Sequence, residues 1–501
     1  MTLLSRISGL VRDVVFAGLI GAGGGIAADA FYVAFRIPNF LRRIFGEGAF
    51  STAFVPVFTE HKVRDSHAAL RGFVDRMTGA FGLILLAATA IGVASAPVLV
   101  SIMAPGFDAA KSALTTDMLR LTFPYLFFIS LVAMSGGILN SYERFGVAAF
   151  TPVLLNLSLI GAALWLAPRL AEPAMALAWG VLIAGAVQLV FQVPFLARLD
   201  MLPRPKLRRD HDGVAKVFRL MLPAIFGVSV AQINTLINTI IASFLVTGSV
   251  SWLYYSDRLM EFPLGVFGIA LATVILPSLS KSHAARSHDE FERLLDWGLR
   301  VTLLICIPAT AGLIVLASPL VTTIYFRGVF TANDVAMTTG ALIAFASGLP
   351  AFALVKVLAP GFYARQDTKT PVRIGMISMA ANIVLSIVLA WPLRHVGLAM
   401  AITLAACLNA AQLFLRLRRD GVYAPLPGWR TFLTRIFVAT AIMTGLLALF
   451  SGHPDLWLHL PGWERVLRLG FWVMIGVVVY VATLFLLGVR FNELRLAKPR
   501  A

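Results

Sequence analysis

The sequence predicts an all-α integral membrane protein with about fourteen transmembrane helices. Hydrophobic residues make up 59% of the 501 positions and charged residues only 13%, whereas a soluble domain carries about 45–50% and about 25%, respectively. The apolar residues form long runs separated by short polar or Gly/Pro-containing connections, and a membrane-spanning helix needs about 20 apolar residues. These observations exclude an ordinary soluble domain.

Fourteen apolar runs mark the expected spans. Their approximate bounds are 2–21, 27–58, 77–104, 117–140, 147–167, 174–197, 217–246, 252–280, 297–317, 336–363, 371–391, 396–415, 431–450 and 466–488. Several of these runs exceed the length needed to cross a bilayer, so we expect those helices to tilt or to project beyond it.

Positive charge is unevenly distributed between the connections. The loops after even-numbered spans, together with the C-terminal tail, hold about 27 Lys and Arg residues, and the opposite loops hold about 6. By the positive-inside rule, both termini and the even-numbered loops should be cytoplasmic. The net charge of +17 is therefore a topology signal, and we expect no nucleic acid as a partner.

An internal repeat at an interval of about 220–226 residues divides the chain. The matched features are Thr151-Pro152 with Thr370-Pro371, Asn156 with Asn382, and Gln188 with Gln412. Each repeat would hold six helices, an even number, so both halves would share one orientation, as in transporters with a site between parallel repeats. We expect a six-helix lobe at residues 1–200, a second at 201–420 and a two-helix extension at 421–501.

Ionisable residues stand inside three of the expected spans. The first span holds Arg6, Arg12 and Asp13, the second holds Asp29, Arg36, Arg42, Arg43 and Glu47, and the eighth holds Asp257, Arg258 and Glu261. If only eight of these eleven groups faced lipid, at about 2.5–3.5 kcal/mol each, the cost would be on the order of 20 kcal/mol. That cost exceeds the stability of a typical fold, so these side chains should face one another or water.

Helical geometry gathers these charges onto faces. On an ideal helix, four charged residues of the second span share a stripe about 40° wide. They are Asp29, Arg36, Arg43 and Glu47. In the eighth span Glu261 follows Asp257 by four residues and Arg258 by three, so these three also share a face. Because the two spans occupy equivalent places in the repeats, we expect their charged faces to line a central cavity.

The chemistry of this set favours an anionic ligand. All six of its cations are arginines, and the planar guanidinium group binds phosphate or carboxylate through two parallel hydrogen bonds. Five carboxylates accompany them, which could orient the arginines. Two interpretations stay open on these grounds, a ligand site for a phosphate-bearing molecule and a set of interhelical salt bridges without a ligand.

The strings that carry these charges resemble the MurJ/MviN family of lipid II flippases in the MOP transporter superfamily. The matching strings are SRISGLVRD, ADAFYVAFRIPNFLRRIFGEGAFSTAFVPVF, APGF, GVSVAQINTLINTIIASFL, GSVSWLYYSDRLMEFPLGVFGIALATVILPSLS and VKVLAPGFYARQDTKTPV. The resemblance covers all fourteen spans. It implies a two-lobed fold in the bacterial inner membrane, with a central cationic cavity that opens alternately to the cytoplasm and the periplasm.

The resemblance also implies a substrate and residue roles. The substrate would be lipid II, undecaprenyl diphosphate that carries a disaccharide-pentapeptide. The cavity triad that engages the diphosphate and head group would be Arg12, Asp29 and Arg258. The supporting residues would be Arg6, Arg42 and Arg43 for the positive field, Glu47 and Glu261 for gating or for positioning the arginines, and Arg36 and Asp257 in the same substrate-binding region. The last two helices would form an apolar groove for the polyprenyl tail.

Two departures from the family pattern stand out. Family members usually have a longer segment before the position of Arg6, so we expect the natural chain to begin upstream. Some members hold sodium with carboxylates on the seventh and eleventh spans, where this chain has Asn234, Asn238 and Asn382. We therefore expect no metal site and no cofactor.

The expected function is transport of lipid II from the cytoplasmic to the periplasmic leaflet, in peptidoglycan biosynthesis, with no catalytic residues. Lipid II and membrane lipids are the expected partners of a monomeric chain, with the cell-wall synthesis machinery as a further candidate. One alternative is a related exporter of another lipid-linked glycan or of a drug. The other is a membrane-embedded glycan polymerase, for which Asp108, Asp117 and Asp334 supply acids in the opposite loops.

Overall fold

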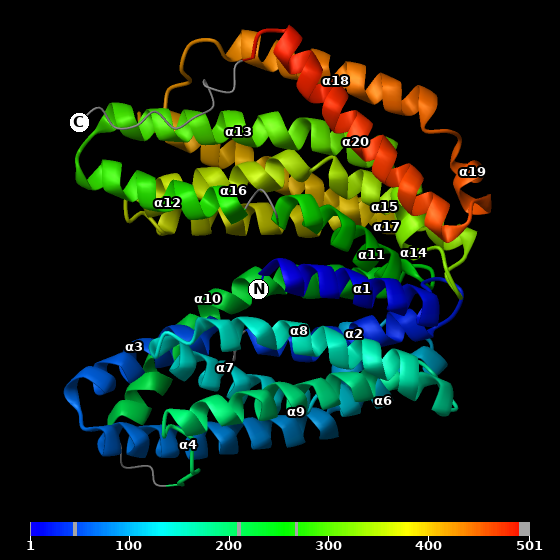
Figure 1. Cartoon of the computed structure of the whole chain (residues 1–501). Coiled ribbons are helices and arrows are strands. Elements are labelled where there is room, and N and C mark those ends of the chain that lie inside the picture. Colours follow the sequence, from blue (N-terminus) through cyan, green and yellow to red (C-terminus); the bar gives the residue numbers. More distant parts are fainter. Residues whose placement is uncertain (1, 44–47, 208–211, 266–268, 490–501) are drawn as a thin grey trace. The chain divides into compact units, whose positions relative to one another are not determined.

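The computed structural model describes residues 2–43, 48–207, 212–265 and 269–489. Within these ranges it describes the side chains outside residues 2–3, 226–231 and 269–274. The described chain is all-α, with no strand in those ranges (Figure 1).

Contacts between Cα atoms divide the chain into two compact units. The first comprises Met1–Ser251 with Arg327–Phe330, and the second comprises Trp252–Phe326 with Thr331–Ala501. The division falls within helix α11 (Ser249–Pro263), whereas the sequence repeat places the lobe boundary at residue 200.

The first unit contains ten long or medium helices in the described ranges. They are α1 (Thr2–Ile20), α2 (Ala27–Arg42), α3 (Ala49–Arg64), α4 (His67–Ala94), α5 (Ala96–Met103), α6 (Ala109–Thr122), α7 (Tyr125–Ser141), α8 (Phe145–Gly161), α9 (Met175–Arg198) and α10 (Asp212–Ser243). A π-helical turn, Ala162–Leu166, and a 3₁₀ turn, Ala167–Arg169, extend α8.

The second unit contains α11, from Trp252 onward, and the helices that follow it. They are α12 (Ile269–Ala284), α13 (His288–Val315), α14 (Ala317–Tyr325), α15 (Ala332–Ala346), α16 (Leu349–Tyr363), α17 (Lys369–Arg419), α18 (Trp429–Phe450), α19 (Pro454–His459) and α20 (Gly462–Leu486).

Nine helical segments of the described ranges are long and apolar enough to cross a membrane. They are His67–Ala94, Ala109–Ser141, Phe145–Arg169, Met175–Arg198, His288–Val315, Ala332–Tyr363, Lys369–Arg419, Trp429–Phe450 and Gly462–Leu486. The prediction of an all-α integral membrane protein is therefore confirmed. The expected count of fourteen spans stays a prediction.

One of these segments contains two expected spans. Helix α17 is broken at Arg394, whose φ of 52° and ψ of −134° are not helical. The break lies between the expected spans 371–391 and 396–415. Next to it, the ring Nε2 of His395 lies 2.9 Å from the carbonyl oxygen of Met337 in α15, which fixes the position of the break within the second unit.

The two most charged expected spans each correspond to a pair of helices. The run 27–58 corresponds to α2 and α3, on either side of residues 44–47, and the run 252–280 corresponds to α11 and α12, on either side of residues 266–268. Gly48 precedes the first turn of α3 and Pro263 is the last residue of α11. Glycine and proline have the lowest helix propensities, so Gly48 favours a helix boundary at the start of α3 and Pro263 favours one at the end of α11.

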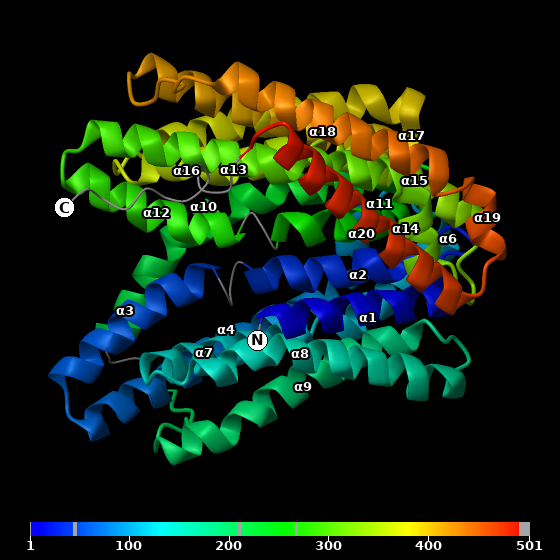
Figure 2. The ribbon, with the colours of Figure 1, turned by 45° about the horizontal axis from the view of Figure 1, so that its top comes forward.

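The C-terminal helices α18 and α20 lie side by side in both views (Figures 1 and 2). Ile436 and Met443 of α18 belong to an apolar cluster that also includes Leu304 of α13. The hydroxyl of Tyr480 in α20 donates to the carbonyl oxygen of Leu304 at 2.7 Å. The opposite faces carry exposed apolar side chains such as Phe437 and Met474, as expected for helices that contact lipid.

A buried carboxylate in the first unit binds the loop that follows α9. Asp75 of α4 is 2% exposed. Its carboxylate accepts hydrogen bonds from the backbone N–H of Arg204 and the ammonium group of Lys206, both at 2.8 Å. The backbone carbonyl of Asp75 also accepts from the N–H of Lys206 at 3.1 Å. These bonds hold residues 204–206 against α4.

The second unit contains a similar arrangement, the Asp296 cluster, formed by Asp296, Arg300, Tyr423, Leu426 and Trp429. The buried carboxylate of Asp296 in α13 accepts from Arg300 Nε at 2.6 Å, the Tyr423 hydroxyl at 2.8 Å, the Leu426 N–H at 3.2 Å and Trp429 Nε1 at 2.7 Å. Burial, followed by the hydrogen bond to Asp296, raises the pKa of Tyr423 above its usual value. The cluster therefore joins the loop before α18 to α13.

The two carboxylates occupy the same place in two similar helices. Helices α4 and α13 each contain 28 residues, and each follows an N-terminal serine, Ser66 or Ser287. Asp75 and Asp296 are each the ninth residue of their helix and stand 221 positions apart in the sequence.

We expect Asp296→Ala to lower the stability of the second unit substantially. The substitution leaves four donors without their acceptor, and breaking such a buried charged group costs about 3–5 kcal/mol. The measurement is the thermal unfolding midpoint of the purified full chain in detergent. Asp289→Ala, at an exposed position on the first turn of the same helix, is the control. Equal unfolding midpoints for the two variants would contradict the proposed contribution of the Asp296 cluster to stability.

Candidate functional site

Arg12 of α1 is buried and bonded within the first unit. Its side chain is 7% exposed, and it contacts Asp13 Oδ1 through Nη2 at 2.6 Å and Nε at 3.0 Å. Its Nη1 donates to Asn156 Oδ1 of α8 at 3.1 Å. The amide of Asn156 in turn donates to the Ser5 carbonyl and the Ser8 hydroxyl of α1. In this conformation Arg12 therefore joins α1 to α8.

Asp29, the first acid of α2, is also buried, at 2% exposure. Its Oδ1 accepts from the N–H and the hydroxyl of Ser251 at 3.0 and 2.6 Å. Its Oδ2 accepts from the N–H of Gly248 at 2.8 Å and lies 3.4 Å from Lys111 Nζ. Lys111, near the start of α6, is itself 4% exposed. The carboxylate thus binds the turn before α11 and compensates a buried ammonium group.

The three arginines of the second expected span contact neutral side chains. Arg36 Nη1 donates to the hydroxyl of Thr239 in α10. Arg42 Nε donates to Asn39 Oδ1 at 2.9 Å, and Arg43 Nη1 donates to Gln232 Oε1 of α10 at 3.3 Å. Arg43 is exposed, and Arg36 and Arg42 are half-buried.

Two further predicted residues complete the set from the first unit. Arg6 of α1 is half-buried, and none of the described residues forms a hydrogen bond or ion pair with its guanidinium group. Glu47, predicted to act in gating or positioning, lies outside the described residues.

Arg258 of α11, in the second unit, is accessible and stands beside an acid. Its side chain is 40% exposed, and Nη1 lies 3.0 Å from Glu261 Oε2, one turn along the helix. Its Nε contacts the Tyr254 hydroxyl at 3.3 Å, and its guanidinium carbon lies 5.3 Å from the centre of the Tyr254 ring. Asp257 is half-buried on the same helix. Arg258 and Glu261, which the sequence predicts to share a face of the helix, therefore form an ion pair.

Each member of the predicted triad has partners within its own unit. Arg258 pairs with Glu261, whereas Arg12 pairs with Asp13. Among the described residues, the partners of the Asp29 carboxylate are Ser251, Gly248 and Lys111. Arg12 and Asp29 thus each have separate partners within the first unit.

Several residues that hold these charges were not foreseen from the sequence. They are Lys111, Asn156, Gln232, Thr239 and Ser251. A signal existed only for Lys111, because it is one of the few cations in the loops with little positive charge. The others are neutral polar residues, which are common in helices, and their contacts with residues far away in sequence have no local pattern.

The acids that left an enzyme interpretation open serve structural roles. Asp108 is the N-cap of α6 and accepts from the Lys111 N–H at 2.8 Å. Asp334 is fully buried, forms a capping box with Thr331 at the start of α15, and accepts from Trp252 Nε1 at 2.8 Å. Asp117 pairs with exposed Arg120 at 3.3 Å. Among the described residues no group of three or more His, Cys, Asp or Glu side chains could hold a metal ion.

A family model described as lipid II flippase MurJ matches residues 16–460. The chain belongs to the MurJ lipid II flippase family. The resemblance seen in the sequence is thereby confirmed, and the family is one of transporters, not of enzymes.

Curated relatives of the MurJ family match along almost the whole chain. A probable lipid II flippase MurJ of Vibrio cholerae serotype O1 is 48% identical, over 99% of this chain and 96% of the relative. A lipid II flippase MurJ of Burkholderia cenocepacia is 41% identical, over 99% of this chain and 97% of the relative.

Solved structures agree on the fold. A lipid II flippase MurJ in an inward closed conformation matches with a TM-score of 0.81 and 28% identity, over 99% of this chain and 98% of that one. An inward-facing multidrug resistance MATE transporter of the MOP superfamily matches with a TM-score of 0.69 and 15% identity, over 83% of this chain and 95% of that chain. The latter likeness concerns the fold alone.

We expect Asp29→Ala to destabilise the chain even without any ligand. The change leaves the Lys111 ammonium buried without its carboxylate, at a cost of about 3–5 kcal/mol. The double variant Asp29→Ala/Lys111→Met removes both charges and should recover part of this loss. Thermal midpoints of the purified variants, with Asp117→Ala as a surface control, measure the effect. A stable Asp29→Ala protein that has lost only lipid II binding would refute the structural role.

Proposed function

We propose that this chain transports lipid II from the cytoplasmic to the periplasmic leaflet of the bacterial inner membrane by alternating access. The observation that carries the proposal is the family match over residues 16–460, which includes the charged strings of α2 and α11. The relatives named above are described as lipid II flippases. An arginine-rich set suits the diphosphate of such a substrate.

Arg258 is the residue to which we assign direct contact with the diphosphate. Its guanidinium group is partly exposed and bound to a partly exposed acid, so a diphosphate oxygen can take the place of Glu261 without a buried charge being left unpaired. Glu261 would then hold Arg258 in position when no substrate is bound. Asp257 belongs to the same proposed region.

From the first unit, Arg6, Arg36, Arg42 and Arg43 would add positive charge for the head group. The contacts of the last three include neutral oxygens of Thr239, Asn39 and Gln232, and a guanidinium group stays positively charged at physiological pH. Arg12 and Asp29 stay in the proposed set as residues whose internal contacts exchange for substrate contacts during the transport cycle. Glu47 remains a proposed gating residue.

We further propose fourteen spans arranged as two parallel six-helix repeats, with both termini in the cytoplasm. The matched positions of Asp75 in α4 and Asp296 in α13 support the repeat, and the charge asymmetry of the loops supports the orientation. Helices α18 and α20, which expose apolar side chains, would hold the polyprenyl tail. The proposed working form is a monomer that meets the cell-wall synthesis machinery.

The orientation predicts opposite labelling of two exposed loop residues. Single cysteines at Ala285 and Ala332, introduced after replacement of Cys306 and Cys407 by alanine, should react differently with a membrane-impermeant thiol reagent. In intact cells with a permeable outer membrane we expect labelling at 332 and protection at 285, with both labelled after lysis as the accessibility control. Labelling at 285 with protection at 332 would reverse the proposed topology.

The function itself predicts a specific requirement for arginine at position 258. Loss of a charge-assisted hydrogen bond pair in Arg258→Ala should weaken lipid II binding by roughly ten- to a hundredfold and abolish complementation of a flippase-depleted host. Arg258→Lys should also fail, because an ammonium group cannot form the bidentate contact. Binding is measured by native mass spectrometry on the folded variants.

The matched control is Arg293→Ala, which removes an exposed arginine from α13 and should preserve both binding and complementation. If Arg258→Ala lowered the melting temperature but left lipid II affinity unchanged, the role of Arg258 would be structural. If depletion of the protein left lipid II evenly accessible in the periplasmic leaflet, the transport proposal itself would fail.

A further inference from the structure

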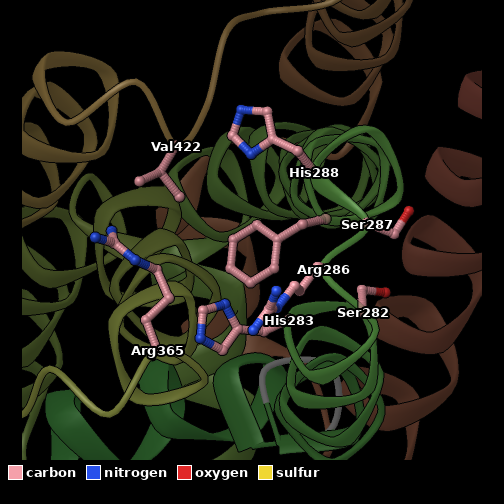
Figure 3. A pocket seen from close by; sticks show the side chains of 8 residues that line it. Ser282, His283, Arg286, Ser287, His288, Arg365 and Val422 are labelled. Carbon is pink, nitrogen blue, oxygen red and sulfur yellow. The ribbon is translucent and has the colours of Figure 1, made fainter.

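A pocket of about 270 Å³ lies at one end of the second unit, apart from α11 and its charged face. It is formed where α12 ends, α13 begins and the loop after α16 starts. Its lining includes His283, Arg286, Ser287, His288, Phe291 and Arg365 (Figure 3). The helices α13, α16 and α17 that meet here belong to membrane-spanning segments, so the pocket lies at a membrane–water boundary.

The polar lining is basic. Figure 3 shows His283 beside Arg286, with Arg365 on the other side of the pocket. Among the described residues that line the pocket there is no acid. The acids around it are Asp289 and Glu290 in the first turn of α13, Asp367, which interacts electrostatically with Arg365, and Glu292. Glu292 lies 3.8 Å from His288 Nε2 and accepts a hydrogen bond from the Ala424 N–H at 3.1 Å, so it is already engaged with the neighbouring loop.

Arg365, which lines this pocket, has a buried donor without an acceptor. Its Nη1 atom is buried and has no hydrogen-bond partner among the described residues. A buried guanidinium nitrogen without an acceptor is costly, because it has lost water and gained nothing in exchange. Rotation of the guanidinium group toward a ligand acceptor in the pocket would remove this cost.

Arg286 occupies a position that normally favours glycine. It follows the end of α12 with a φ of 54°, and the N–H of Ser287 bonds to the Ser282 carbonyl at 3.0 Å. This is the terminal arrangement in which glycine is the usual residue. An arginine here carries a backbone cost, and its side chain lines the pocket.

The corresponding helix end of the first unit is neutralised internally. Asp65 precedes the N-terminal serine of α4, just as Arg286 precedes that of α13. Asp65 contacts His61 Nδ1 at 2.5 Å, and the Ser66 hydroxyl accepts from the Ala69 N–H at 3.3 Å. At α13 an arginine replaces the acid, and Ser287 makes no side-chain capping hydrogen bond. Because Asp289 and Glu290 in the first turn of α13 offset the positive end of its dipole, the positive charge of the pocket comes from the two arginines.

We propose that this pocket binds a phosphate group, carried by the head group of an anionic phospholipid or present as free phosphate. Two guanidinium groups can donate several charge-assisted hydrogen bonds to phosphate oxygens. Basic pockets between membrane helices are typical sites for anionic head groups. The volume is below the roughly 300–1,000 Å³ of sites for drug-sized ligands, and it suits a head group rather than a whole lipid-linked glycan.

The apolar lining gives the lipid form a place for its glycerol carbons. Phe291 packs edge-on against His283, with ring centres 6.5 Å apart, and Val422 lines the same pocket. A phosphate at the arginines would then continue into an apolar wall at the membrane boundary. This site is independent of the proposed lipid II contact at Arg258.

The test uses the purified full chain in detergent and the double variant Arg286→Ala/Arg365→Ala. Dihexanoyl phosphatidylglycerol should raise the thermal midpoint of the original chain. The variant should need at least about tenfold more of this lipid, the change expected from loss of one charge-assisted hydrogen bond. Dihexanoyl phosphatidylcholine should have little effect, because its choline cation meets a basic pocket. Native mass spectrometry should show one bound phosphatidylglycerol fewer in the variant.

Inorganic phosphate, compared with sodium chloride at equal ionic strength, distinguishes the two sources. A midpoint shift with phosphate that the variant loses identifies free phosphate as a ligand, and its absence together with a lipid response identifies the phospholipid. Both results support the phosphate site. Equal responses of the original chain and the variant to both probes would overturn it, as would equal effects of the two lipids.

Two controls separate binding from folding. Arg64→Ala/Arg144→Ala removes the same charge from exposed positions at helix ends of the first unit and should keep the full lipid response. Arg365→Gln keeps most of the side-chain volume if the alanine variant unfolds. A folded Arg286→Ala/Arg365→Gln protein with the original lipid affinity would also overturn the proposal.

Discussion

The structure depends on one constraint, that a carboxylate enclosed by apolar helices must receive several hydrogen bonds. Asp29, Asp75, Asp296 and Asp334 are each about 2% exposed or less, and each accepts from at least two donors. Leaving one such acid unpaired would cost several kcal/mol. Because most donors come from turns and loops between helices, the same bonds that satisfy the acids also determine where the connecting segments lie within each unit.

This constraint separates two kinds of charged residue in the candidate site. Arg12 and Asp29 have nearly all of their surface enclosed and hold α1 against α8 and the turn before α11 in place. Arg43 and Arg258 are exposed, and their contacts with Gln232 and Glu261 are with partly exposed groups. A ligand can compete for the exposed arginines at small cost. Binding to the enclosed residues would require helices or turns to move. Recognition and conformational change would therefore use different arginines of one set.

The sequence revealed the membrane class, the family and the positions of the charges because these depend on composition and on local runs. It also located the break near Arg394 from a gap between two apolar runs. It could not supply Thr239 or Ser251 as partners, because these are neutral residues distant in the sequence from the charges they contact. The pocket at Arg365 depends on how three helix ends meet.

The hydrogen bonds of Asp75 and Asp296 have a consequence for the order of biosynthesis. Lys206 follows Asp75 by 131 residues and Leu426 follows Asp296 by 130, so each acid is synthesised roughly 7 to 26 s before these loop partners at usual translation rates. In the proposed orientation both acids are near the cytoplasmic ends of their helices, where water can solvate them during that interval. Each half of the protein can close these bonds only after its sixth helix has left the ribosome, which makes them a late step of insertion.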